Sequence, residues 1–210
     1  FIGKDSTLGD SINIENAHEY IFGMSLVNDW SARDIQKWEY VPLGPFVSKS
    51  FATSISTWIT PIQALKPFLV EPPKQDPKPL KYLCSKEQKT HYDIDLVVEI
   101  ETQNGSKEII SRSNMKWLYW SMEQQLTHHS VTGCNLRVGD LLASGTISGK
   151  EPSSYGSLLE LSWNGTNPIK INKEQRSFLE DGDEITLSAH GNSSKGNVNL
   201  GEVKGRIIGR

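Results

Sequence analysis

The stretch Asp93-Ile94-Asp95-Leu96-Val97-Val98-Glu99-Ile100-Glu101 decides the fold class of this sequence. Apolar side chains stand at every second position from residue 94 to residue 100, which is the period of a strand with one buried face. The pair Asn104-Gly105 follows and favours a tight hairpin turn, so residues 107–111 are expected to pair back onto the first strand. The sequence therefore predicts an antiparallel hairpin here.

Strands outnumber helices in the rest of the sequence. Further strands are expected at residues 24–27, 141–143, 158–163, 169–171, 184–189 and 203–208. Helices are expected at residues 17–22, from Ser31 to just before Pro42, and from Asn114 to just before Gly133. Strands and helices do not alternate regularly, so the sequence predicts a β-rich α+β domain rather than a doubly wound parallel sheet.

Proline interrupts one long segment. Six of the ten prolines lie between Pro61 and Pro79, where they exclude regular structure over most of the stretch. We interpret this segment as a surface excursion within one domain, because 210 residues suffice for a single large core.

The charge and composition narrow the range of partners. A formal net charge of -3 gives no basic field for a nucleic-acid backbone, so no nucleic-acid partner is expected. No apolar run reaches the length of a membrane span, so no membrane partner is expected either. Two cysteines without a CxxC spacing fit a reducing compartment, which indicates the cytoplasm.

Polar side chains gather between residues 29 and 49. Arg33, Gln36 and Tyr40 are spaced i, i+3 and i+7, so a helix presents them on one face. Asp29 precedes this helix and Lys49 follows the turn after it. The mixture suits an anionic, oxygen-rich ligand and a hard divalent cation. The alternative is an ordinary solvated helix face.

Two further candidate ligand-binding features lie within residues 145–160. Glycines flank the segment around Thr146 and allow close approach of a ligand to backbone and hydroxyl, although an ordinary glycine-rich turn has the same pattern. Glu160 lies in the predicted apolar strand 158–163, where an unpaired carboxylate would be costly to bury. Glu160 is therefore expected either to face water or to have a polar partner.

The stretch Asn28-Asp29-Trp30-Ser31-Ala32-Arg33-Asp34-Ile35-Gln36 resembles the signature of the fumarylacetoacetate hydrolase superfamily. The resemblance continues through residues 37–46, 49–51, 124–131 and 139–149, and it spans essentially the whole chain. It implies a mixed β-sandwich and roll of the C-terminal domain type and a homodimer. It also implies a bound Mg²⁺ or Ca²⁺ and a small diketo acid as substrate. The implied reaction is metal-dependent hydrolysis of 4-fumarylacetoacetate to fumarate and acetoacetate, the last step of tyrosine and phenylalanine breakdown.

The resemblance also assigns roles to individual residues. It places Asp29 among the metal ligands and Lys49 and Thr53 in the cation region. It places Gln36, Tyr40 and Thr146 at substrate-binding positions. It implies that Arg33, Gln36 and Lys49 stabilise an oxyanion. It also implies that Glu160 orients the catalytic histidine.

One part of the family pattern has no match in this sequence. The family's general-base histidine and its ExE metal motif lie upstream of the position of Phe1, and neither His18 nor His91 has a matching context. Residues 1–210 are therefore expected to form a partial catalytic domain that is inactive by itself. Two alternatives stay open: a non-catalytic chain that only dimerises or binds a ligand, and another superfamily enzyme such as an acylpyruvate hydrolase or oxaloacetate decarboxylase.

Overall fold

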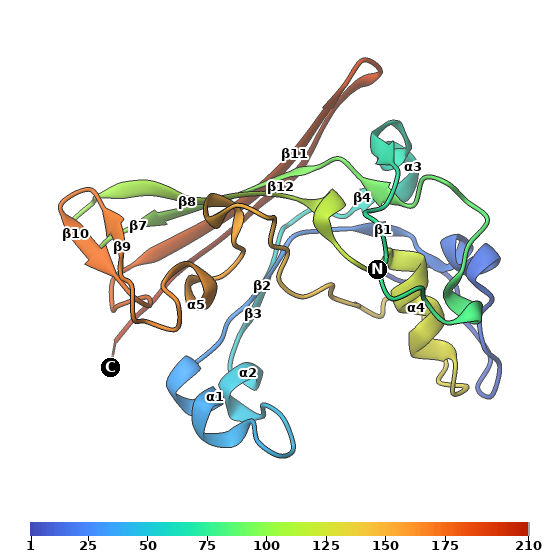
Figure 1. Cartoon of the computed structure of the whole chain (residues 1–210), viewed down its shortest axis with the longest axis horizontal. Helices are drawn as coiled ribbons and strands as arrows, with labels where there is room; N and C mark the ends of the chain where they lie inside the picture. The colour runs from blue at the N-terminus through green and yellow to red at the C-terminus, as the bar shows by residue number, and fades with distance from the viewer. Residues whose placement is uncertain (210) are drawn as a thin grey trace.

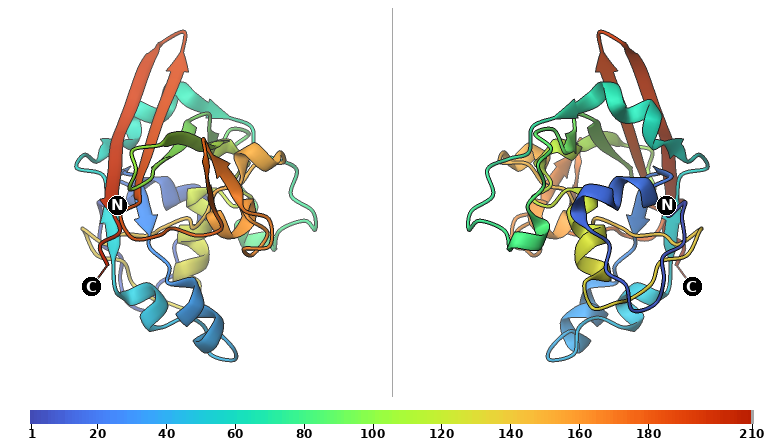
Figure 2. Two further views of the ribbon diagram at one scale, coloured as in Figure 1. Left: turned by 90° about the vertical axis from the view of Figure 1, so that its left-hand side faces the viewer. Right: turned by 90° about the vertical axis from the view of Figure 1, so that its right-hand side faces the viewer.

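A four-stranded antiparallel sheet forms the centre of the computed structural model, which describes residues 1–209 (Figure 1). The strand order is β12–β11–β7–β8. The strands are β7 (Asp95–Glu101), β8 (Lys107–Asn114), β11 (Glu184–Ser193) and β12 (Gly196–Arg206). The hairpin predicted from residues 93–111 is confirmed as β7–β8. The tip of the β11–β12 hairpin projects beyond the rest of the sheet in Figures 1 and 2.

The alternating pattern explains how this sheet is buried. Ile94 and Ile100 are fully buried on one face, while Asp95 on the other face is exposed. At one end of the sheet Ile100 packs with Ile185 and with Ile171 of β9 (Ile169–Ile171). The period-2 pattern thus separates a core face from a charged face, as one-sided burial of an antiparallel sheet requires.

Four two-stranded sheets surround the central one. They are β1 (Gly23–Met24) with β4 (Thr60–Pro61), β2 (Val27–Asp29) with β3 (Thr53–Ile55), β5 (Leu69–Val70) with β6 (His91–Tyr92), and β9 with β10 (Glu174–Arg176). The fold is therefore mixed and strand-rich, as predicted.

The helices are short. They are η1 (Ile14–Tyr20), α1 (Arg33–Glu39), α2 (Val47–Ser50), α3 (Ile62–Leu65), η2 (Lys66–Phe68), η3 (Lys81–Leu83), η4 (Met115–Trp117), α4 (Met122–Ser130), η5 (Pro152–Ser154) and α5 (Leu158–Leu161), where η denotes a 3₁₀ helix. Leu65 and Phe68 pack with Ile94 against the sheet, while Ala17 and Leu126 join η1 to α4 in a second cluster. Among residues 1–209, none of the helices combines the length and apolar character that crossing a membrane requires.

Helices α1 and α2 form an arm, residues 30–52, that projects from the body at the end of the β2–β3 ribbon (Figure 1). The Glu39 carboxylate holds the arm together by accepting hydrogen bonds from the N–H of Phe46 (2.6 Å), the N–H of Ser48 (2.9 Å) and the Ser48 hydroxyl. The bond from the Ser48 hydroxyl is the main cause that lowers the pKa of Glu39. Helix α1 buries none of its residues, so the arm rests on these local bonds.

The predicted strand at residues 158–163 is wrong, because this segment forms helix α5. Ser157 stands at the N-cap, and its side chain accepts a hydrogen bond from the N–H of Glu160 (3.4 Å). Ser-x-x-Glu is a helix-start sequence, and this local cap outweighs the apolar run that suggested a strand. The predicted strand at residues 141–143 is also wrong, since the segment has no regular structure.

The single helix expected after Asn114 is divided in two. Asn114 caps only the short η4, and the chain is extended at Leu118 before α4 begins after Ser121. Ser121 and Gln124 form a complete capping box, which starts a new helix at this point. Similarly, the first helix begins at Ile14 with Asn13 as its cap, earlier than predicted. The prediction that prolines exclude regular structure over most of residues 61–79 is wrong for the first part, because short helices and strands continue to Val70. Regular structure is absent only from there to η3.

Candidate active site

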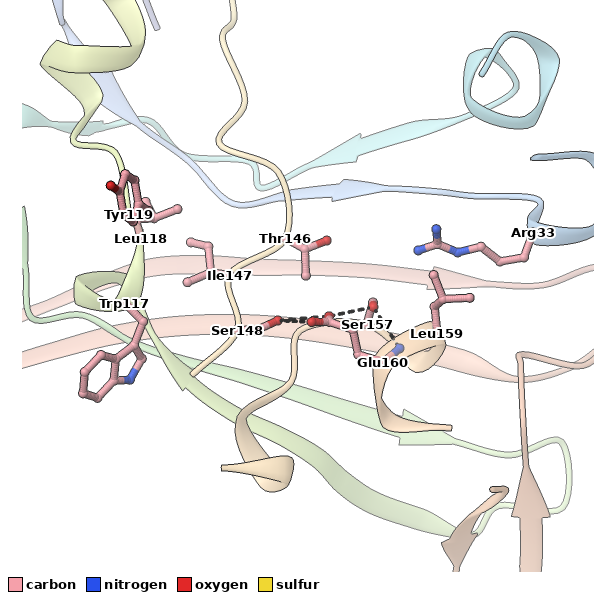
Figure 3. Close-up of a pocket in the computed structure, with 10 residues that line it drawn as sticks. All are labelled: Arg33, Trp117, Leu118, Tyr119, Thr146, Ile147, Ser148, Ser157, Leu159 and Glu160. Atoms are coloured by element: carbon pink, nitrogen blue, oxygen red, sulfur yellow. Dashed lines mark hydrogen bonds between the residues drawn. The ribbon is translucent and has the colours of Figure 1, made fainter. Parts of the chain in front are cut away.

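A pocket of about 430 Å³ lies between the arm and the body (Figure 3). Three residues singled out in the sequence line it together: Arg33 from α1, Thr146 from an extended loop, and Glu160 from α5. The other lining residues are Trp117, Leu118, Tyr119, Ile147, Ser148, Ser157 and Leu159. Figure 3 shows Arg33 on one side of the pocket and Trp117 to Tyr119 on the opposite side.

Glu160 is held by two serine hydroxyls. The Ser148 hydroxyl donates to both carboxylate oxygens, at 2.8 and 3.0 Å, and the Ser157 hydroxyl donates to Oε2 at 2.8 Å. The Ser148 oxygen in turn accepts a bond from the N–H of Gly156 at 3.0 Å. Hydrogen bonds from fixed donors hold a carboxylate in one orientation. We call these three side chains, Glu160, Ser148 and Ser157, the carboxylate clamp.

Arg33 is a half-buried cation without a salt bridge in the described part of the chain. Burial lowers the pKa of its guanidinium, and the negative charges of Asp29 and Glu160 oppose that shift. The group stays protonated, because the ordinary pKa of arginine lies far above neutrality. Its Nη1 donates to Oε1 of Gln36 at 2.8 Å. The remaining donors are available to an anion in the pocket.

Asp29, Lys49 and Thr53 form a second group at the base of the arm. The Lys49 ammonium lies 2.5 Å from Oδ2 of Asp29, and Asp29 stands opposite Thr53 in the β2–β3 ladder. Directly opposite residues of an antiparallel pair share one face, so the carboxylate and the threonine hydroxyl are neighbours.

These residues do not make a complete cation site. Within residues 1–209, no three His, Cys, Asp or Glu side chains gather closely enough to hold a metal ion. Mg²⁺ and Ca²⁺ take at least six oxygen ligands, whereas this group offers one carboxylate that an ammonium already neutralises. The described side chains alone therefore supply too few oxygen ligands for either ion.

Two predicted substrate-binding residues stay outside the pocket lining. Tyr40 forms the C-cap of α1 and is 54% exposed. Gln36 reaches the site only through its bond to Arg33, which confirms that these two share a helix face. None of the histidines in the described chain lines the pocket.

Comparison with known proteins places the whole chain in one family. A family model described as "Fumarylacetoacetate (FAA) hydrolase C-terminal" matches residues 1–208. The chain belongs to this family. Its match to the Homo sapiens fumarylacetoacetase is 55% identical over 99% of this chain and 50% of that protein. The Arabidopsis thaliana fumarylacetoacetase is 52% identical over 99% of this chain and 49% of that protein.

The chain spans about half the length of the curated relatives it matches. A solved structure titled "Crystal structures of Cg1458" aligns with a TM-score of 0.53 at 15% identity, covering 97% of this chain and 57% of that one. This agreement concerns the fold alone, and the family model supports the fumarylacetoacetate hydrolase C-terminal architecture that the sequence indicated.

Sequence reasoning missed several residues of this family member's pocket. Ser157 carried a usable signal, because Ser157-Leu158-Leu159-Glu160 has the spacing of a capping box that brings both side chains together. Ser148 carried no comparable signal, since its bond to Glu160 spans 12 residues across an irregular loop. The wall from Trp117 to Tyr119 was assigned to a continuous helix, whereas in the structure η4 ends at Trp117 and the chain is extended at Leu118.

Proposed function

We propose that this chain contributes to hydrolysis of the carbon–carbon bond of 4-fumarylacetoacetate, giving fumarate and acetoacetate. The observation that supports this most directly is the pocket that joins the desolvated cation Arg33 to the carboxylate clamp around Glu160. The name fumarylacetoacetase, borne by relatives of about half-identical sequence, points to the same reaction.

The substrate chemistry suits these groups. In the hydrolysis, water adds its oxygen to a ketone carbon, the adjoining carbon–carbon bond breaks, and the departing acetoacetate carbon takes a proton. The ketone oxygen gains negative charge during the addition, and a positioned guanidinium stabilises such charge. We propose that Arg33 binds this oxygen or a substrate carboxylate, and that Thr146 contacts the bound ligand.

Glu160 is proposed as an orienting group. Its two oxygens are already fixed by serine hydroxyls, so a proton-accepting side chain that donates to it would be held in one orientation. In the described chain, no histidine lies at the pocket to play that part. Without a general base, a loss of roughly 10²- to 10⁴-fold in rate is typical. We therefore propose that the 210-residue chain alone does not turn over substrate.

The direct test follows the ultraviolet absorbance of fumarylacetoacetate with the purified chain. We expect fumarate to bind and no turnover to be measurable. Robust hydrolysis by the chain alone would contradict the proposed division of roles, because it would require a base among the pocket residues.

We propose Asp29 as one oxygen ligand of Mg²⁺ or Ca²⁺, with Thr53 beside it and Lys49 as a competing charge. Titration calorimetry with Mg²⁺ tests this assignment. Asp29→Asn should abolish the weak binding, whereas Lys49→Met should strengthen it, because the carboxylate is then free of its ammonium. Equal Mg²⁺ affinity in the wild type and in Asp29→Asn would show that the ligand lies elsewhere.

We also propose a homodimer and a cytoplasmic location. The arm exposes large apolar side chains, and patches of this kind are typical of protein interfaces: Trp38 (90%), Leu43 (80%), Val41 (69%), Val47 (60%) and Phe51 (57%). The free, exposed thiols of Cys84 and Cys134 suit a reducing compartment. Sedimentation of the wild type against Trp38→Asp tests the dimer, since a charge at that position should shift the chain towards monomer.

A non-catalytic role in ligand binding is the second candidate, and the lack of a pocket histidine in the described chain favours it. Other reactions of the superfamily are distinguished from this one by the substrate that is turned over fastest. Acylpyruvates and oxaloacetate, offered beside fumarylacetoacetate to an active assembly containing this chain, should be turned over more slowly if the proposal is correct.

A further inference from the structure

The wall of the pocket opposite Arg33 is formed by Trp117, the last residue of η4, and by Leu118 and Tyr119 after it (Figure 3). Leu118 and Tyr119 lie between η4 and α4, so no helix or sheet hydrogen bonds hold their backbone carbonyls. The position of the wall depends instead on three bonds from other parts of the chain. Each of them fixes one atom of the wall.

The first bond comes from His91, which is buried in β6 and lies 2.8 Å from the Leu118 carbonyl through Nε2. A carbonyl can only accept, so Nε2 carries the proton. Burial lowers the pKa of His91, which keeps the ring neutral. The second bond runs from the Tyr119 hydroxyl to the Pro77 carbonyl at 3.1 Å.

The third bond comes from Gln75 in the irregular proline-rich segment. Its Nε2 donates to the Tyr119 carbonyl at 2.6 Å and to Oε1 of Gln124 at 3.0 Å. Nε2 of Gln124 donates back to Oε1 of Gln75 at 3.0 Å and to the Leu83 carbonyl, also at 3.0 Å. Gln124 is buried and belongs to the capping box of α4, so it is a rigid anchor for this amide pair.

We infer that Gln75 is a positioning residue of the pocket: it fixes the wall at Tyr119 and so sets the fit of a ligand that reaches across from Arg33. The inference rests on the proposed function of this pocket. It gives the proline-rich segment a role at a site that the segment does not itself line. The residue acts through the backbone of Tyr119 and touches no ligand.

Fumarate binding to the 210-residue chain, measured by titration calorimetry, tests this inference with Gln75→Met. Methionine keeps the length and volume of the side chain but removes both donated bonds and the bond that Gln75 accepts from Gln124. We expect the dissociation constant for fumarate to rise about threefold to tenfold, the range for loss of a hydrogen bond that orders a site. Acetate is too short to span the pocket, so its affinity should be unchanged.

Gln125→Met is the matched control. Nε2 of Gln125 donates to the Trp120 carbonyl at 3.1 Å, one residue beyond Tyr119, and Trp120 does not line the pocket. This variant loses the same kind of bond and should bind fumarate as the wild type does. Unfolding midpoints of both variants, measured together, separate a general loss of stability from a change in the pocket.

The results separate the role of Gln75 from the proposed function of the pocket. No fumarate binding by the wild type overturns the proposed function, and the inference with it. Wild-type affinity in Gln75→Met, or an equal loss in both glutamine variants, overturns the inference alone. If Gln75→Met does not fold, Gln75→Ala decides the question, because it removes the same donated bonds with a smaller side chain and should also weaken fumarate binding about threefold to tenfold.

Discussion

Arg176 and Arg33 are both buried at least in part, yet their surroundings differ completely. Arg176 is 7% exposed, and it donates to the two oxygens of the buried Asp183 at 2.8 and 3.0 Å and to Glu174 at 3.2 Å. The bond to Asp183 is the main cause that raises the pKa of Arg176. Arg33 has a lowered pKa and no such partner in the described chain. The first guanidinium is satisfied by its own fold, whereas the second keeps its charge for a ligand.

The largest effect is expected where the satisfied pair is broken. Asp183→Asn removes the fully buried counter-charge of Arg176 and leaves only the more exposed Glu174 and Glu180, so the free energy of unfolding should fall by about 3–5 kcal/mol. Urea denaturation measures this change. The control is Glu180→Gln, because Glu180 is mostly exposed and lies 3.6 Å from the same guanidinium. A change of similar size in both variants would refute the special role of Asp183.

Arg33 should matter for ligand binding and not for stability. Arg33→Met removes a charged donor from the pocket, so fumarate affinity should fall about tenfold or more. The free energy of unfolding should not decrease, because no ion pair within the described chain is lost. Arg137→Met, at an exposed position, should leave both quantities unchanged. A large loss of stability in Arg33→Met would place Arg33 with Arg176 as a structural residue.

His91 extends the comparison to a buried group that must stay neutral. Its folded pKa lies below the ordinary value of 6.5, chiefly because of burial. Between those two values the unfolded chain binds a proton that the folded chain does not. The free energy of unfolding should therefore decrease as the pH falls below 6.5, by at most about 1.4 kcal/mol per pH unit from this group. Urea titrations at several pH values should show a flatter slope for His91→Gln.

The smallest effect is expected at the pair between Lys49 and Asp29. Both side chains are partly exposed, and such pairs contribute about 0–1 kcal/mol. Lys49→Met should therefore change the free energy of unfolding by less than about 1 kcal/mol. A loss of several kcal/mol would mean that this pair supports the fold as the Arg176 pair does.

The sequence predicted those parts of the structure that depend on residues close together in the chain. Alternation at residues 94–100 was enough for the hairpin, and the i, i+3 spacing was enough to bring Arg33 and Gln36 into contact. Glu160 was expected either to face water or to have a polar partner, and the structure shows partners, although its segment was wrongly assigned to a strand. The bond from Ser148 and the bond from Gln75, which spans 44 residues, depend on tertiary packing and leave no periodic pattern.

The arm that carries Arg33 is weakly attached to the body. It buries no residue of α1 and joins the body through the β2–β3 ladder and through Trp30, which packs against the core cluster of Ile100, Ile171 and Ile185. Its opening should therefore need less free energy than global unfolding. The pocket is then shared between two cooperative units: Arg33 belongs to the weaker one, and the carboxylate clamp belongs to the body. A molecule that bridges Arg33 and Glu160 adds its binding free energy to the closed form, so occupancy and closure of the arm are thermodynamically linked.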